Sequence, residues 1–192
     1  MTLRVAQVLL AFLLMSVGLA EKESEEGQVE QIHYQGLEVR KSIFGDFSMM
    51  RKERDDYATT LTLLALEDAR ADPGDVAKMN EVRGLIALAL HLSPRNRTAV
   101  IANHQLERGL MPEKKEADYS RSVFARLLLT RGKLLKDQKT KSDQFVGRCF
   151  VQLAAELDLR NEEAVYGSEI QKIDGVEVDW SIFTDGVDAD EE

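Results

Sequence analysis

The chain has 192 residues, of which 34 are Asp or Glu and 25 are Lys or Arg, with one Cys, three Pro and one Trp. This length allows one domain with tails, and the composition excludes a collagen-like chain, a disulfide-stapled mini-protein and a zinc ribbon. The formal net charge of -9 argues against a nucleic-acid partner, because affinity for a phosphate backbone needs a cationic face.

Residues 1–20 predict a signal peptide. Arg4 precedes an apolar run from Val5 to Val17, which is short for the roughly 20 residues that cross a bilayer. Small residues at Gly18 and Ala20 predict cleavage after Ala20. We therefore expect an exported protein, periplasmic or extracellular. The alternative is an uncleaved segment that tethers the protein to a membrane.

Residues 21–53 predict a mobile or irregular N-terminal segment. Its first part is highly charged, and the weak alternation between 32 and 47 suits either irregular structure or a short strand. Residues 54–173 instead show apolar positions three and four apart, interrupted by turn residues, and predict a helical domain. The expected helices run from Arg54 to Asp72, Asp75 to Leu92, Ser93 to Gly109, Pro112 to Lys136, Ser142 to Leu157 and Glu162 to Lys172.

Residues 174–192 change period. Val176, Val178, Trp180 and Ile182 alternate with polar residues, the pattern of a half-buried strand. We expect a short β segment here, which either docks a partner or covers the open end of the helices. The last eight residues hold five acids and no base, which is typical of a disordered acidic tail.

Two stretches of the helical domain resemble each other at an offset of 65 positions. Residues 89–99 read Ala-Leu-His-Leu-Ser-Pro-Arg-Asn-Arg-Thr-Ala, and residues 154–164 read Ala-Ala-Glu-Leu-Asp-Leu-Arg-Asn-Glu-Glu-Ala. Each predicts a helix end, a tight turn and the start of an antiparallel helix. The positions of this repeated turn are Ala89, Leu92, Pro94, Asn96 and Ala99 in the first copy, and Ala154, Leu157, Asn161 and Ala164 in the second.

This pattern resembles the tetratricopeptide repeat, in which Ala-Leu-x-Leu-x-Pro-x-Asn-x-x-Ala joins one helical pair to the next. The second copy has Leu159 where the family has proline, and the offset of 65 is not twice the family's 34-residue unit. The resemblance implies an all-α fold of antiparallel helical hairpins stacked as a short array. It also implies a concave surface that docks a peptide or another protein, and no chemistry. A generic helical bundle is the alternative.

Motifs for catalysis or cofactor binding are missing: the sequence has no P-loop, dinucleotide-binding, zinc-protease or nucleophile-elbow pattern. We therefore expect no enzyme, no cofactor and no metal. Cys149 stands alone and is expected in the core. Asn96-Arg97-Thr98 is a formal glycosylation sequon in a predicted turn.

The sequence thus favours an exported helical-repeat scaffold that binds a protein or peptide partner. The competing hypothesis is a ligand carrier or enzyme whose site is assembled from dispersed residues, for example His91, His104 and Asp68.

Overall fold

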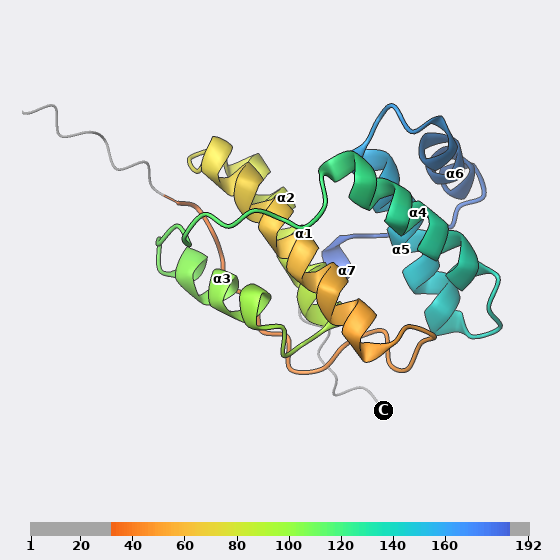
Figure 1. Cartoon of the computed structure of the whole chain (residues 1–192), viewed down its shortest axis with the longest axis horizontal. Helices are drawn as coiled ribbons and strands as arrows, with labels where there is room; N and C mark the ends of the chain where they lie inside the picture. Colours follow the sequence, from red (N-terminus) through yellow and green to blue (C-terminus); the bar gives the residue numbers. More distant parts are fainter. Residues whose placement is uncertain (1–31, 185–192) are drawn as a thin grey trace, which may run out of the picture.

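The structure is a computed structural model that describes residues 32–184 (Figure 1). Every regular element in this part of the chain is a helix, which confirms the all-α prediction. The helices are α1 (Arg51–Ala71), α2 (Val76–Leu92), α3 (Arg97–Glu107), α4 (Arg121–Lys136), α5 (Lys141–Leu157), α6 (Glu162–Ile173) and α7 (Ser181–Thr184). The predicted signal peptide and the predicted acidic tail lie outside the described residues.

The first six helices form two units of the same plan, which we call the first unit (α1–α3) and the second unit (α4–α6). In each unit two long antiparallel helices pack side by side, and the short third helix packs on them. The spacing of 65 extends to the helix boundaries. It separates the starts of α2 and α5, their ends, and the starts of α3 and α6. The first helices differ, since α1 has 21 residues and α4 has 16.

The shorter α4 corrects the prediction of a helix from Pro112. Residues 109–120 are not helical, and α4 begins at Arg121. Gly109 has a φ of 68°, which ends α3 in the left-handed conformation that glycine tolerates. The charged run Glu113-Lys114-Lys115-Glu116 is exposed and buries no apolar side chain. A helix there would gain no packing energy, and packing supplies most helical stability in proteins.

The start of α5 differs slightly from the prediction. Thr140 is the N-cap, and its hydroxyl accepts a hydrogen bond from the Asp143 N–H, whereas Ser142 was expected in this role. Thr140, two residues earlier in the chain, satisfies the Asp143 N–H, one of the first-turn groups that have no partner within the helix.

Residues 32–50, which we call the arm, contain no helix or strand and cross the first unit before entering α1 (Figure 1). The arm contributes three buried side chains to the core, at Leu37, Phe44 and Met49. Its fixed position comes from this burial, because few of its backbone groups pair with one another. Of the two alternatives expected here, irregular structure or a short strand, the arm shows the first, and α1 begins at Arg51 instead of Arg54. The packing of the arm was not predicted.

The two units meet along α1, which faces α4 and α5. Tyr57 lies in the middle of this contact, where it meets Phe124 edge to face and stacks on Phe150, with ring centroids 5.3 and 5.6 Å away. Ion pairs close both ends, Arg121 with Asp68 at 2.7 Å and Arg131 with Glu53 at 2.9 Å. An apolar centre with charged ends aligns the two units in one orientation.

A buried carboxylate also joins the arm to the second unit. Asp143 is 1% exposed and accepts hydrogen bonds from the Ser48 hydroxyl at 3.0 Å and the Thr140 hydroxyl at 2.6 Å. Burial by itself would raise the pKa of Asp143, but the hydrogen bonds from Thr140 and Ser48 outweigh it and hold this pKa below its usual value.

The segment from 174 to 184 forms no β strand, which corrects that expectation. It bridges the two units instead. The Val178 N–H donates to Gln152 Oε1 of α5 at 3.2 Å, and Phe183 packs against His91 of α2. Val178 and Phe183 are buried, whereas Val176 is exposed, so strict alternation fails. No neighbouring strand is present in the described chain, and the helices supply the hydrogen-bond partners.

Within residues 32–184, no helix combines the length and apolar character needed to cross a bilayer.

Candidate functional site

The two repeated turns predicted from the sequence form corners of the same geometry. Ser93 and Asp158 end α2 and α5 with nearly identical backbone angles, φ/ψ of -144°/89° and -143°/88°. Asn96 and Asn161 are the N-caps of α3 and α6, and each side-chain oxygen accepts the N–H three residues later, at 3.0 and 3.2 Å. The sequence likeness thus reflects a shared local structure, built from an asparagine cap and two helix ends.

The alanines of both turns are fully buried where two helices approach each other. Leu92 is buried, and Leu157 is partly buried. The proline position of the turn differs more between the two copies. Pro94 is half-buried, whereas its counterpart Leu159 is 80% exposed. The buried set is Ala89, Ala99, Ala154 and Ala164.

The corner of the first unit is closed against α1. The Asn96 side-chain nitrogen lies 3.1 Å from the Asp55 carbonyl oxygen, 3.0 Å from Asp55 Oδ1 and 2.8 Å from Thr59 Oγ1. The Ser93 hydroxyl donates to Asp55 Oδ1 at 2.9 Å. Asn96 is only 2% exposed as a result. The nitrogen that a glycan would modify is therefore buried and engaged in the folded chain.

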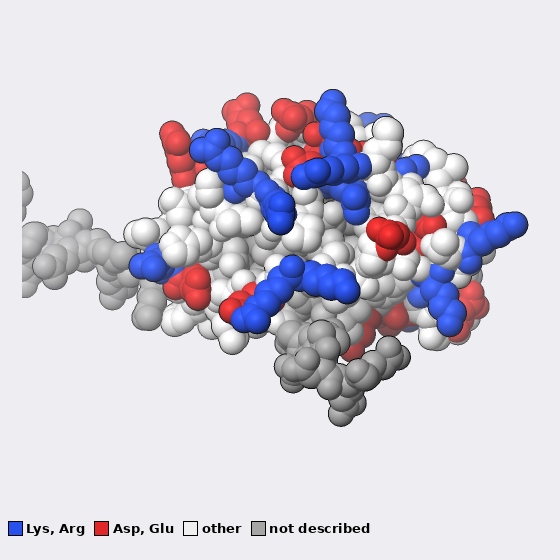
Figure 2. Space-filling model, turned by 90° about the horizontal axis from the view of Figure 1, so that it is seen from below, with Lys and Arg blue, Asp and Glu red and all other residues white. Residues whose placement is uncertain are grey.

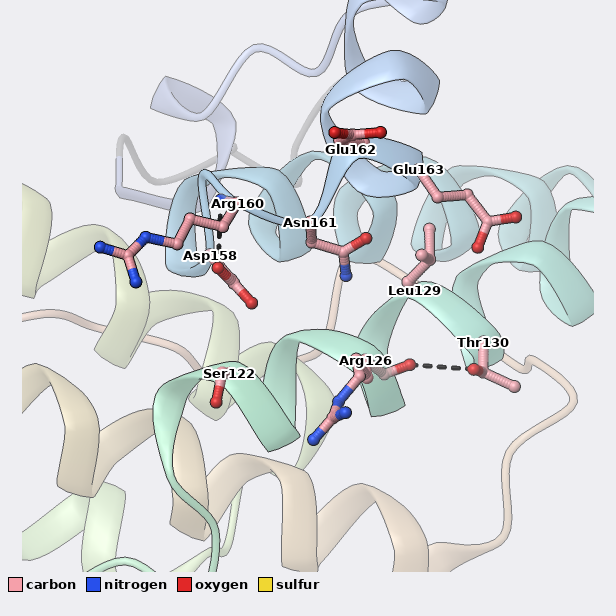
Figure 3. A pocket seen from close by; sticks show the side chains of 9 residues that line it. All are labelled: Ser122, Arg126, Leu129, Thr130, Asp158, Arg160, Asn161, Glu162 and Glu163. Atoms are coloured by element: carbon pink, nitrogen blue, oxygen red, sulfur yellow. Dashed lines mark hydrogen bonds between the residues drawn. The ribbon is translucent and has the colours of Figure 1, made fainter.

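The corner of the second unit is open. A groove of about 610 Å³ separates it from α4 (Figure 3). Ser122 and Arg126 line the α4 side with the same four-residue spacing as Asp55 and Thr59 on α1. Asn161 Nδ2 and the Arg126 guanidinium have no hydrogen-bond partner among residues 32–184, although both lie at the groove. The remaining lining residues are Leu129, Thr130, Asp158, Arg160, Glu162 and Glu163.

The first corner carries a serine that faces an aspartate on the long helix, and the second corner carries an aspartate with a serine on the long helix. Ser93 donates to Asp55 in the first unit, and the second unit has Asp158 at the corner and Ser122 on α4. Figure 3 shows the Asp158 carboxylate and the Asn161 amide directed toward α4, while Arg160 points away. The Asp158 side chain accepts the Arg160 N–H at 3.1 Å. The open groove therefore presents an acceptor and a donor from the corner, facing a hydroxyl and a cation.

The charge around the groove is mixed. Glu163 of α6 forms an ion pair with Lys133 of α4. On another face of the molecule, seen from below in Figure 2, Lys and Arg side chains also occur together with Asp and Glu, and neither sign covers the surface. The groove lining itself combines Arg126 and Arg160 with Asp158, Glu162 and Glu163, so it forms no continuous positive patch of the kind that a polyanion needs.

The residues named for a ligand or enzyme site, His91, His104 and Asp68, each have different partners and do not form one cluster. His91 is buried on α2, where Nδ1 accepts the Ile43 N–H at 3.3 Å and Nε2 lies 3.3 Å from the Phe183 carbonyl oxygen. Burial lowers the pKa of His91, and the Phe183 carbonyl partly offsets this effect. His104 is exposed and accepts from Arg108, and Asp68 pairs with Arg121. Within the described part, no group of three His, Cys, Asp or Glu residues is arranged to hold a metal ion.

The sequence does not predict which side chains of α1 and α4 face the two corners. Asp55 Oδ1 accepts hydrogen bonds from the Ser93 hydroxyl and from the Asn96 side-chain nitrogen. Nothing in its sequence neighbourhood identifies this role. The four-residue spacing of Asp55 and Thr59 indicates only that both lie on one side of a helix.

Comparison with protein-family models, curated proteins and solved structures finds no match to this chain. The two units provide an internal comparison, in which one corner is closed and the other is open.

Proposed function

We propose that the protein is an exported helical-repeat scaffold, similar to tetratricopeptide-repeat proteins, that binds a polypeptide partner in the groove between α4 and the Asp158–Asn161 corner. The observation that carries this proposal is the open groove itself. The equivalent corner of the first unit is closed by a helix that supplies acceptors to the cap asparagine. The second unit lacks these acceptors, so a partner can supply them.

The groove chemistry supports a polypeptide as the ligand. Asn161 Nδ2 and Arg126 offer donors to backbone carbonyls or carboxylates, and Asp158 offers an acceptor to backbone N–H groups. Leu129 adds a small apolar contact. This arrangement offers groups that bind and position a polypeptide.

Two substitutions test the groove with little disturbance of the fold. Peptides are selected for binding to the whole protein from a random displayed library, and their affinities are then measured for variants. Arg126→Glu reverses the cation, and Asn161→Asp retains the capping oxygen for Ala164 while removing the free donor. Arg95→Glu is the control, because Arg95 is an exposed cation at the closed corner.

We expect the selected peptides to lose at least about tenfold in affinity with Arg126→Glu and with Asn161→Asp, which is about 1.4 kcal/mol for each. Arg95→Glu should leave the affinity unchanged. A library that yields no binders, or binders that tolerate both groove variants, would refute the proposed site. Export is tested separately, by mass spectrometry of the secreted product, for which we expect an N-terminus at Glu21.

A further inference from the structure

The arm crosses α3 and α2, and side chains of both helices bind its backbone. Asn103 of α3 accepts the Leu37 N–H at 3.0 Å and donates to the Leu37 carbonyl at 3.1 Å. Arg83 of α2 donates from Nε to the Gln35 carbonyl at 3.0 Å. One amide side chain thus satisfies both backbone groups of one residue. Contacts of this kind hold a peptide backbone whatever its sequence, as in peptide recognition by strand addition.

Two side chains of the arm add specificity to these backbone contacts. The Tyr34 hydroxyl donates to Asn103 Oδ1 at 2.9 Å, and burial raises the pKa of Tyr34, so the phenol remains a donor. Leu37 is 9% exposed and packs into the core. The neighbouring side chains of His33, Gln35 and Glu38 are exposed. Recognition therefore depends on an aromatic residue and on an aliphatic residue three positions later.

The first part of the arm is held separately from the second. Ile43 and Phe44 are anchored on α2 through His91, and Phe44 is 1% exposed. The hydrogen bonds of residues 34–37 go to Asn103 and Arg83, while Leu37 lies in the core and Tyr34 packs against it. Local opening of the first part would expose Leu37 but leave Phe44 and the helices in place, which makes it less costly than global unfolding.

We propose that this surface of α2 and α3 recognises a partner polypeptide with a Tyr-x-x-Leu pattern, and that residues 34–37 occupy it as an intramolecular ligand. The surface belongs to the first unit, and it is distinct from the groove between α4 and the second corner. A tethered segment competes at an effective concentration in the millimolar range, so a partner binds when it outcompetes residues 34–37.

The test uses the whole protein and a fluorescent peptide with the sequence of residues 32–39, Ile-His-Tyr-Gln-Gly-Leu-Glu-Val. The arm is weakened in the protein by Tyr34→Ala together with Leu37→Asp, and binding is followed by fluorescence anisotropy. We expect this variant to bind the peptide at least about tenfold more tightly than the wild type, whose surface is already occupied. Adding Asn103→Ala should weaken this binding by at least about tenfold, because both backbone bonds are lost.

Ser168→Ala is the matched control for Asn103→Ala, since Ser168 stands 65 positions later on α6. It should leave peptide binding unchanged, as should Arg126→Glu in the separate groove. A weakened-arm variant that shows the circular dichroism of the wild type but no saturable binding would overturn the proposal. Binding that tolerates Asn103→Ala would overturn it as well.

If the weakened-arm variant does not fold, amide hydrogen exchange of the wild type replaces it. Excess peptide at millimolar concentration should accelerate exchange of the Leu37 amide, whose bond to Asn103 is broken when the arm is displaced, and should leave amides in the middle of α1 unchanged. Unchanged exchange at Leu37 would reject the exchangeable arm. Neither result depends on the groove of the second unit.

Discussion

Asn→Asp substitutions at the two corners provide a matched pair that separates the closed corner from the open one. Both substitutions retain the oxygen that caps the following helix, and both replace the side-chain nitrogen with a second oxygen. At position 96 the new oxygen would face the Asp55 carbonyl, Asp55 Oδ1 and Thr59 Oγ1 at about the present distances of 3.1, 3.0 and 2.8 Å. At position 161 it would face the open groove.

The expected costs differ by several kcal/mol. Asn96→Asp removes a hydrogen bond to the Asp55 carboxylate, worth roughly 1.5–3 kcal/mol, and bonds to neutral oxygens worth roughly 1 kcal/mol each. It also places two carboxylates together at a site that is 2% exposed. We expect a loss of about 3–5 kcal/mol at pH 7, or on the order of 10 °C in melting temperature. Asn161→Asp should change stability by less than about 0.5 kcal/mol.

Urea unfolding at pH 7, followed by circular dichroism at 222 nm, measures both values. The double variant Asp55→Asn with Asn96→Asp restores one donor and one acceptor, so it should recover more than half of the loss. Equal costs at positions 96 and 161, or no recovery in the double variant, would show that the contact between the first corner and α1 does not stabilise the fold.

Three other predictions concern the contact between α4 and α5, the buried His91 and the Cys149 thiol. Gly147→Ala should destabilise the protein by about 1–3 kcal/mol in urea unfolding, because a Cβ there would lie 2.7 Å from the carbonyl oxygen of Gly132 on α4. Burial lowers the pKa of His91 in the folded protein, so the unfolded chain binds a proton more readily as the pH falls below about 6.5. Stability should therefore fall below that pH, and His91→Gln should reduce the difference in stability measured between pH 7 and pH 5. Burial raises the pKa of Cys149 to about 12, and a thiol reagent should label this residue only when the protein unfolds.

Gly147→Ala has a matched control, and each of the other two predictions has a result that would contradict it. Gly84→Ala on α2 meets no atom within 4 Å and should stabilise the protein by about 0.5–1 kcal/mol, since alanine favours a helix over glycine. A loss at position 84 equal to that at position 147 would argue against a close helix contact. An unchanged pH dependence in His91→Gln would assign it to other groups, and rapid labelling of Cys149 in the native state would contradict its burial.

The repeated turn shows how far the sequence predicts a local site. Asparagine caps and alanines at helix ends act over three or four residues, so the sequence alone places Asn96 and Asn161 at equivalent corners. The difference between the corners was not predictable. It depends on which side chains of α1 and α4 face the turns, about 40 positions away along the chain. Contacts at that distance follow from packing, which leaves no periodic signal.

The all-α class, the boundaries of α2 and the end of α5 follow from the sequence alone, because helix periodicity, caps and turn residues are local. The start of α4 and the course of the arm depend on tertiary packing. So does the position of residues 176–182, which pack between α2 and α5 without forming a strand. A segment such as Val176–Ile182 can alternate in sequence and still lack a neighbouring strand, and only the surrounding helices determine which of its side chains are buried.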